Sequence, residues 1–167
     1  MNPAFLFNLL GFNLVWALLI IVREPWTQGV ALAFIAAHFL FFARPDEKRR
    51  VALIMLVGVV LDGILTLQGW FIFTPAVPWI PAWLMLLWGC FACTLEHSIR
   101  WSLRKWPLAV VVGALAGPFS YWAGQRFGAV EFGQPLLATL TVLAVIWGTL
   151  FAALAHLYQR LGVLADR

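Results

Sequence analysis

The sequence has few charged residues: only 11% of its 167 residues are Asp, Glu, Lys or Arg, and 63% are hydrophobic. Soluble domains carry about 25% charged residues. A soluble chain of this composition would expose more apolar surface than monomeric proteins tolerate. Cysteine is scarce as well, because Cys90 and Cys93 are the only two and both lie in an apolar run. These shortages exclude a soluble enzyme, a disordered tail and a disulfide-rich extracellular module.

The sequence consists mainly of long apolar runs. A membrane-spanning helix needs about 20 mainly apolar residues, and proline, glycine and charged clusters divide the chain into six such segments. The predicted spans are 4–22, 26–43, 51–70, 81–98, 107–126 and 135–157. No Lys or Arg precedes Arg23, so we expect the first run to be a retained helix rather than a signal peptide. The sequence predicts an all-α polytopic membrane protein with one domain, 1–167, a compact bundle of six transmembrane helices.

The basic residues of the connecting segments are unevenly distributed. Two of the eleven, Arg23 and Arg126, lie on one side of the predicted bundle. The other nine lie on the opposite side: Arg44, Lys48, Arg49, Arg50, Arg100, Arg104, Lys105, Arg160 and Arg167. The positive-inside rule then predicts that both termini are cytoplasmic. We interpret these loops as topology signals and contacts for anionic lipid head groups, and expect no nucleic-acid partner.

Asp62 is the sharpest polar feature, because it falls near the middle of the third predicted span. A charge at that depth costs ~2.5–3.5 kcal/mol. Gly58, Asp62, Thr66 and Gly69 recur at helical spacing and should share a face that points into the bundle. Two interpretations stay open: Asp62 bonds a neighbouring helix, for example at Asn13, or it performs acid–base chemistry.

The end of the fourth predicted span carries a second polar group. Glu96 and Arg100 have the spacing of a favourable helical ion pair, which would anchor the helix end. Alternatively, Glu96 and His97 act as acid or base while Arg100 holds an anionic head group. His38 and His156 fall at a depth similar to that of His97, so the three histidines either share a catalytic or metal site or lie separately at the membrane interface. We expect no metal ion and no other cofactor.

Two further patterns have a structural and a functional interpretation. Cys90, Cys93 and His97 lie along one helical face, but no second pair of zinc ligands accompanies them, so we expect the thiols to be small core residues. The fifth span contains Pro118, which should bend it, and a stripe of small residues: Gly113, Gly117, Ser120 and Gly124. This stripe permits close helix packing or a ligand cleft lined by Ser120, Tyr121 and Gln125.

Several motifs together resemble a bacterial integral-membrane family catalogued as domain of unknown function 2878. They are Asn8 and Trp16, Asp62-Gly63, Gly69-Trp70-Phe71, Pro81-x-Trp83-Leu84, Leu87-Trp88, Phe91 through Ser98, Gly117-Pro118-x-x-Tyr121-x-x-Gly124 and Gly128-Ala129. The resemblance implies a bacterial inner-membrane protein, and because members tend to be encoded near cyclopropane-type fatty-acid synthases, it implies a role in lipid modification. The Gly58 to Asp62 element also resembles one in six-helix substrate-binding subunits of vitamin uptake systems and in rod-shape determinant D.

Three functions are therefore open. The first, which we take as our prediction, is an enzyme or accessory factor in membrane-lipid modification, with Asp62, Glu96 and His97 acting on a lipid that enters from the bilayer. The second is a binding or transport module that holds a small amphiphile between the third, fourth and fifth helices, with ligand contacts from Asn13, Thr66, Arg100, Ser120, Tyr121 and Gln125. The third is a structural membrane scaffold whose polar residues only hold the helices together. Membrane lipids are the expected partners, and partner membrane proteins or a homo-oligomer stay open.

Overall fold

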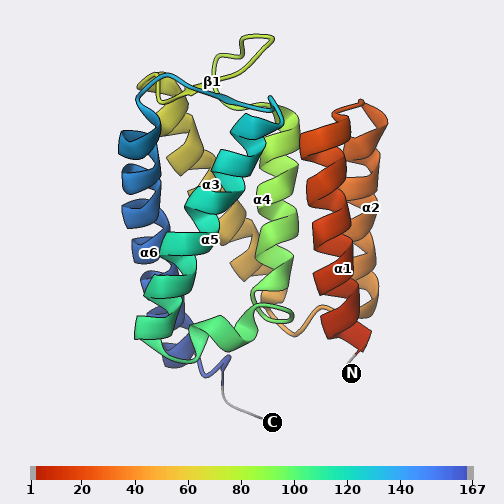
Figure 1. Ribbon diagram of the computed structural model, residues 1–167. Coiled ribbons are helices and arrows are strands. Elements are labelled where there is room, and N and C mark those ends of the chain that lie inside the picture. Colours follow the sequence, from red (N-terminus) through yellow and green to blue (C-terminus); the bar gives the residue numbers. More distant parts are fainter. Residues whose placement is uncertain (1–2, 165–167) are drawn as a thin grey trace.

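The computed structural model describes residues 3–164, which form six α-helices joined by short connections (Figure 1). The helices are α1 (Pro3–Ala17), α2 (Trp26–Phe41), α3 (Glu47–Leu67), α4 (Ala82–Thr94), α5 (Trp106–Arg126) and α6 (Leu136–Arg160). A π-helical turn, Leu18–Val22, extends α1, and a 3₁₀ turn, Arg100–Leu103, precedes α5. The predicted all-α class and the predicted number of helices are confirmed.

Four of the helical segments are long and apolar enough to cross a membrane: Pro3–Val22, Glu47–Leu67, Trp106–Arg126 and Leu136–Arg160. The remaining two, α2 and α4, contain 16 and 13 residues. The span predicted to reach Ser98 is too long, because α4 ends at Thr94 and the chain continues in turns. Glu96 and His97 bond to residues of α3 instead, and these contacts compete with continuation of the helix.

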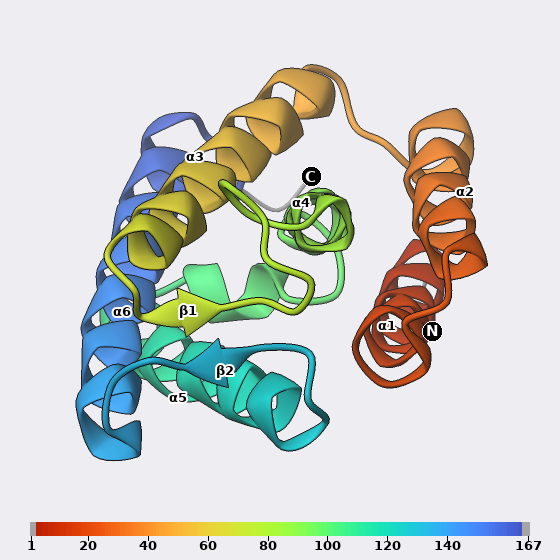
Figure 2. The ribbon, with the colours of Figure 1, turned by 90° about the horizontal axis from the view of Figure 1, so that it is seen from above.

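Helix α4 occupies the middle of the bundle. Seen from above, α3, α5 and the α1–α2 pair surround it, while α6 lies on the outside (Figure 2). Both described ends of the chain lie at the same end of the bundle, together with the α2–α3 and α4–α5 connections (Figure 1). These connections carry most of the basic residues. We therefore call this end of the bundle the basic end. Arg167, which the sequence analysis placed on the same side, lies outside the described residues.

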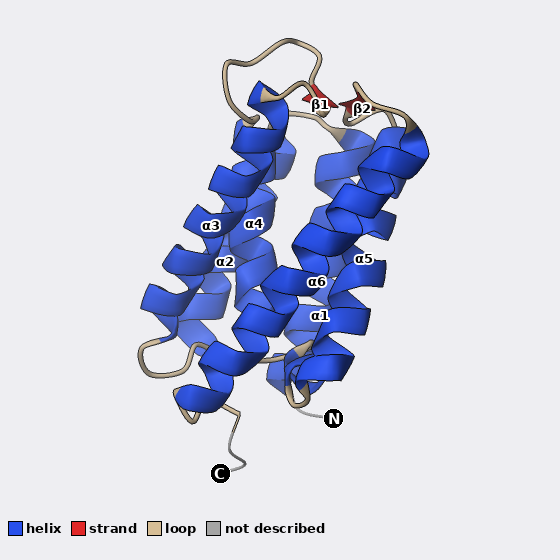
Figure 3. Cartoon of the chain, turned by 90° about the vertical axis from the view of Figure 1, so that its left-hand side faces the viewer, coloured by secondary structure: helices blue, strands red, loops and turns tan. Residues whose placement is uncertain are grey.

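A short antiparallel pair of strands closes the opposite end of the bundle (Figure 3). Strand β1 (Phe71–Ile72) follows α3 and pairs with β2 (Glu131–Phe132), which precedes α6, with Phe71 opposite Phe132. Phe71 is buried and stacks on Tyr121 of α5, with ring centroids 5.1 Å apart. The pair therefore ties the α3–α4 connection to the α5–α6 connection and to the top of α5.

The small residues of α5 permit close contact with α6. A Cβ atom added at Gly113 would lie 2.4 Å from the carbonyl oxygen of Trp147, and one at Gly117 would lie 2.1 Å from the Trp147 ring. The predicted stripe therefore serves helix packing along this part of α5. Pro118 is buried, and α5 is continuously helical through it.

Candidate functional site

A cavity of about 210 Å³ lies between α1, α4, α5 and α6. Its lining is almost entirely apolar, and the polar side chains among the lining residues are those of Thr94, Ser120, Tyr121 and the tryptophans. Aromatic rings form much of the wall: Phe12, Trp16, Phe73, Trp83, Trp88, Phe91, Tyr121, Trp147 and Phe151. An apolar cavity of about 150 Å³ is already large enough to stay dry and bind benzene. This cavity therefore suits a hydrocarbon group.

Asp62 lies behind the wall of this cavity and fixes two of its residues. It is 2% exposed and does not line the cavity itself. The Trp88 indole N–H donates to Asp62 Oδ2 at 2.7 Å, and the Tyr121 hydroxyl lies 2.7 Å from both carboxylate oxygens and donates to this group. One carboxylate from α3 thus orients side chains of α4 and α5, which makes Asp62 a positioning residue for the cavity.

The aromatic wall is further held by ring stacking. Trp88 stacks on Trp147 of α6, with ring centroids 5.1 Å apart and planes inclined by 12°. Gly58 makes room for this arrangement, because a Cβ atom there would lie 2.0 Å from the Trp88 ring. The cavity is thus built by contacts from α3, α4, α5 and α6 together.

Two hydrogen bonds join α1 to the far side of the cavity. The Trp16 indole N–H donates to Ser120 Oγ at 3.0 Å, and both residues line the cavity. The Arg23 guanidinium donates to the carbonyl oxygen of Gly128. The cavity therefore lies between α1 and α5 as well as beside α4, and not between the third, fourth and fifth helices as predicted from the sequence.

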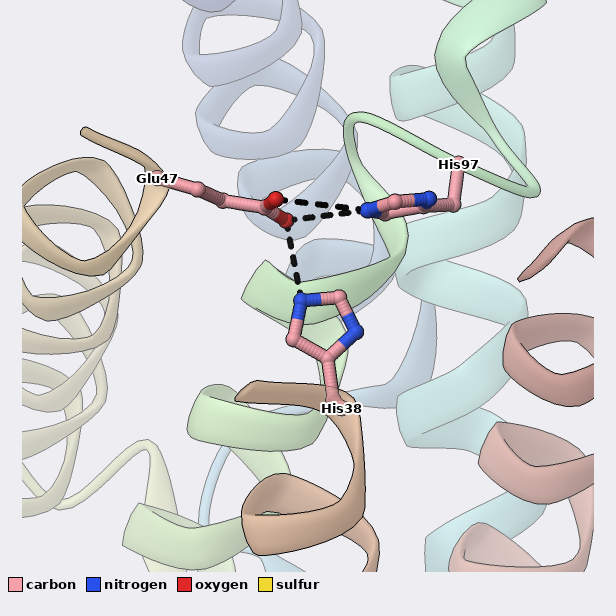
Figure 4. Close-up of side chains that lie close together, drawn as sticks. All are labelled: His38, Glu47 and His97. Carbon is pink, nitrogen blue, oxygen red and sulfur yellow. Dashed lines mark hydrogen bonds and ion pairs between the residues drawn. The ribbon is translucent and has the colours of Figure 1, made fainter. Parts of the chain in front are cut away.

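A second polar cluster lies at the basic end, where three connections meet (Figure 4). It consists of His38 near the end of α2, Glu47 at the start of α3 and His97 in the turn after α4. His38 Nε2 is 3.0 Å from Glu47 Oε1, and His97 Nε2 is 3.2 and 3.3 Å from Oε1 and Oε2. The three side chains are at most 4% exposed. We call this the His–Glu–His cluster.

Glu96 lies beside this cluster but has a different partner from the one predicted. Arg50 of α3 donates to both Glu96 oxygens, at 2.5 and 3.1 Å, while Arg100 donates to the carbonyl oxygen of Val163. Because α4 has already ended, positions 96 and 100 do not have helical spacing. Glu96 and His97 also border an open hollow, together with Phe5, Arg44, Arg100, Trp101 and Arg104. This hollow is rich in arginine, as a surface that contacts anionic groups would be.

The structure distributes the remaining predicted site residues among different places. Asn13 is exposed and donates to the carbonyl oxygen of Leu9. Asp62 does bond neighbouring helices, as one interpretation of the sequence had it, but through Trp88 and Tyr121 and not through Asn13. Thr66 donates to the backbone oxygen of Asp62. Ser120 and Tyr121 line the cavity, whereas Gln125 is half-buried outside its lining.

The three residues predicted to act as acid or base make separate hydrogen bonds. Asp62 bonds to Trp88 and Tyr121, Glu96 to Arg50, and His97 to Glu47. Of the three histidines, His38 and His97 come together while His156 is exposed. Cys90 and Cys93 are buried free thiols, as expected of small core residues.

Sequence reasoning missed Glu47, Arg50, Trp88 and Trp147 as site residues. Glu47 stands within the basic segment 44–50, where it reads as one charge among many. A usable signal was its position at the start of an apolar run, nine residues after His38. Its second partner, His97, lies 50 residues further along the chain, and no local pattern links the two.

No curated protein and no solved structure matches the chain. Residues 5–153 match the family described as protein of unknown function (DUF2878), which confirms the resemblance expected from the sequence motifs. Since this match covers most of the sequence, the chain belongs to the DUF2878 family.

Proposed function

We propose that the protein binds the acyl chain of a membrane lipid in the aromatic cavity and acts in the modification of that lipid, as an enzyme or an accessory factor. The observation that carries this proposal is the apolar cavity of about 210 Å³ beside α1 and α5. A cavity that is apolar except for a few oriented polar groups is typical of a binding site for a mainly hydrophobic ligand. A lipid in the surrounding bilayer supplies such a ligand.

The arrangement of polar groups supports a division of roles within the site. Asp62 is covered by Trp88 and Tyr121, so its role is to hold the cavity wall rather than to contact the ligand. Thr94 and Ile99 line the cavity towards the basic end, and Glu96 and His97, close by in the sequence, border the arginine-rich hollow. In this proposal the acyl chain lies in the cavity, and the anionic head group contacts Arg100 and its neighbours. The protein then lies in the bacterial inner membrane with the basic end in the cytoplasm.

Photolabelling with a fatty-acyl lipid that carries a diazirine near the end of its chain tests the binding step. Gly124 lines the cavity, and a Cβ atom there meets only Val130 Cγ1, at 3.8 Å. Gly124→Leu should therefore fill cavity space and lose most of the labelling of the purified protein. Gly29→Leu is the matched control, because a Cβ atom at Gly29 meets nothing within 4 Å. Equal labelling of both variants and the wild type would contradict the proposal.

A second experiment separates lipid modification from a binding or transport role. A binding or transport role is favoured by the observation that two aromatic side chains, Trp88 and Tyr121, separate Asp62 from the cavity. Lipids of a strain lacking the gene would be profiled by mass spectrometry, with complementation by wild type or Gly124→Leu. A lipid species that only the wild type restores supports modification. An unchanged profile, with photolabelling intact, supports a binding or transport module instead.

A further inference from the structure

The His–Glu–His cluster brings three metal-binding side chains together in a region that the cavity does not include. One ligand atom from each of His38, Glu47 and His97 lies within 4.8 Å of the others. His38 and Glu47 are fully buried, and the His97 side chain is 4% exposed. Buried polar clusters of this kind are either hydrogen-bonded anchors between helices or ligand sets, and the two uses differ in donor geometry.

The donor spacing fits a single metal ion. Two ligand atoms that each lie about 2.1 Å from a tetrahedral ion are about 3.4 Å apart. The measured nitrogen–oxygen separations are 3.0 Å from His38 and 3.2 and 3.3 Å from His97. The two imidazole nitrogens lie within 4.8 Å of each other, so an ion that replaces the imidazole protons would keep the nitrogen–oxygen separations nearly unchanged and draw the two rings together by up to about 1.4 Å.

We infer that His38, Glu47 and His97 bind one divalent first-row transition-metal ion through two imidazole nitrogens and one carboxylate oxygen. Imidazole and carboxylate ligands in this ratio suit zinc and non-haem iron, and three protein ligands leave a coordination position open. This inference differs from the sequence-based expectation of no metal ion, and it takes up the alternative in which histidines of similar depth share a metal site. It goes beyond the proposed lipid-binding function and does not depend on it.

Neighbouring groups orient the carboxylate for this role. The backbone N–H of Arg44 donates to Glu47 Oε2 at 2.6 Å, a contact that fixes the carboxylate as outer contacts of metal ligands commonly do. Arg50, one turn further along α3, is engaged by Glu96 and so does not compete for Glu47. The cluster therefore keeps its carboxylate directed at the two imidazoles.

The arginine-rich hollow lies on the His97 side of the cluster. His97 borders this hollow together with Glu96 and Arg44, while His38 and Glu47 do not line it. A ligand from the basic end would thus reach the ion on the His97 side. A site with an open position next to a polar hollow has the form of a catalytic rather than a purely structural metal centre.

The test uses the full chain in detergent micelles, stripped with EDTA and titrated calorimetrically with Zn²⁺, and separately with Fe²⁺ under anaerobic conditions. We expect one ion per chain for at least one of the two metals. His97→Ala and Glu47→Gln should bind that metal about 100-fold more weakly or worse, since even loss of an outer contact costs 10–100-fold. His156→Ala is the matched control, because His156 is exposed and outside the cluster, and it should bind like the wild type. Failure of the wild type to bind either metal stoichiometrically, or equal weakening by His156→Ala, would overturn the inference.

X-ray absorption of the Zn²⁺-loaded wild type gives a result that does not depend on how the variants fold. Nitrogen and oxygen ligands with an imidazole signature are expected. Sulfur in the coordination shell would mean that Cys90 or Cys93 binds the ion, and would also overturn the inference. Acyl-chain photolabelling of the same sample reports separately on the cavity, so failure of the metal site and failure of the proposed function can be told apart.

Discussion

Replacing Gly58 with alanine would place a methyl group against the ring of Trp88. The added carbon would lie 2.0 and 2.2 Å from the Trp88 ring atoms Cδ2 and Cε3, whereas non-bonded carbons prefer about 3.5–4.0 Å. The ring must therefore move by roughly 1.5 Å. A shift of this size disturbs both the stacking of Trp88 on Trp147 and the 2.7 Å hydrogen bond to Asp62.

The expected cost follows from two contributions. Overpacking of a core costs about 1–3 kcal/mol, and the loss of a hydrogen bond to a buried carboxylate costs about 1.5–3 kcal/mol. Gly58→Ala should therefore lower the free energy of unfolding by about 2.5–6 kcal/mol. Gly29→Ala, at an open helical position, should raise it by up to about 1 kcal/mol through helix propensity.

Equilibrium unfolding in mixed micelles of increasing SDS content would measure these free energies. A double-mutant cycle isolates the clash: in a Trp88→Leu background, where the ring is absent, Gly58→Ala should cost less than about 1 kcal/mol. An equal cost of Gly58→Ala in both backgrounds would show that the penalty has a source other than the Trp88 ring.

Two further predictions concern the basic end and the orientation of the bundle. Glu96→Gln should lower the free energy of unfolding by about 3 kcal/mol in the same assay, because it removes one member of a largely buried ion pair with Arg50. Glu24→Gln, at an exposed position, should change it by less than about 0.5 kcal/mol. Similar costs of the two substitutions would contradict a stabilising role of the Arg50–Glu96 pair. Since both native cysteines are buried, a membrane-impermeant maleimide should label intact cells that carry Thr74→Cys, but should label Asp46→Cys only after permeabilisation. The reverse pattern would contradict cytoplasmic termini.

Local sequence patterns were sufficient to predict the helices but not their partners. Apolar runs and their boundaries lie within about 20 residues, so composition alone locates the six segments. The end of α4 escaped this reasoning, because the helix stops where Glu96 and His97 meet Arg50 and Glu47, some 50 residues earlier. A contact between distant segments leaves no periodic signal at either of them.

The contacts of the candidate site could not be predicted from local sequence patterns either. Asp62 and Tyr121 both stood out, one as a charge in an apolar span and the other as a polar residue in a small-residue stripe. Nothing in their 59-residue separation indicated that the Tyr121 hydroxyl bonds to Asp62. Trp88 belongs to one of the motifs that resemble the family, but as one of ten tryptophans it was not singled out as a site residue. Its role becomes visible only through the indole hydrogen bond to Asp62 and the room left at Gly58.

The early end of α4 also affects the surrounding lipid. Thirteen residues of α-helix rise only about 20 Å, against a hydrocarbon core of about 30 Å, and the 16-residue α2 packed beside it is short as well. The turns after α4 stay buried in protein at Leu95, Glu96 and Ser98, as irregular backbone at membrane depth must be. A bundle with two short helices among four long ones fits a bilayer that is thinned on one side or a bundle axis that is tilted. Either adjustment would bring the membrane–water interface closer to Glu47 and His97 at the basic end.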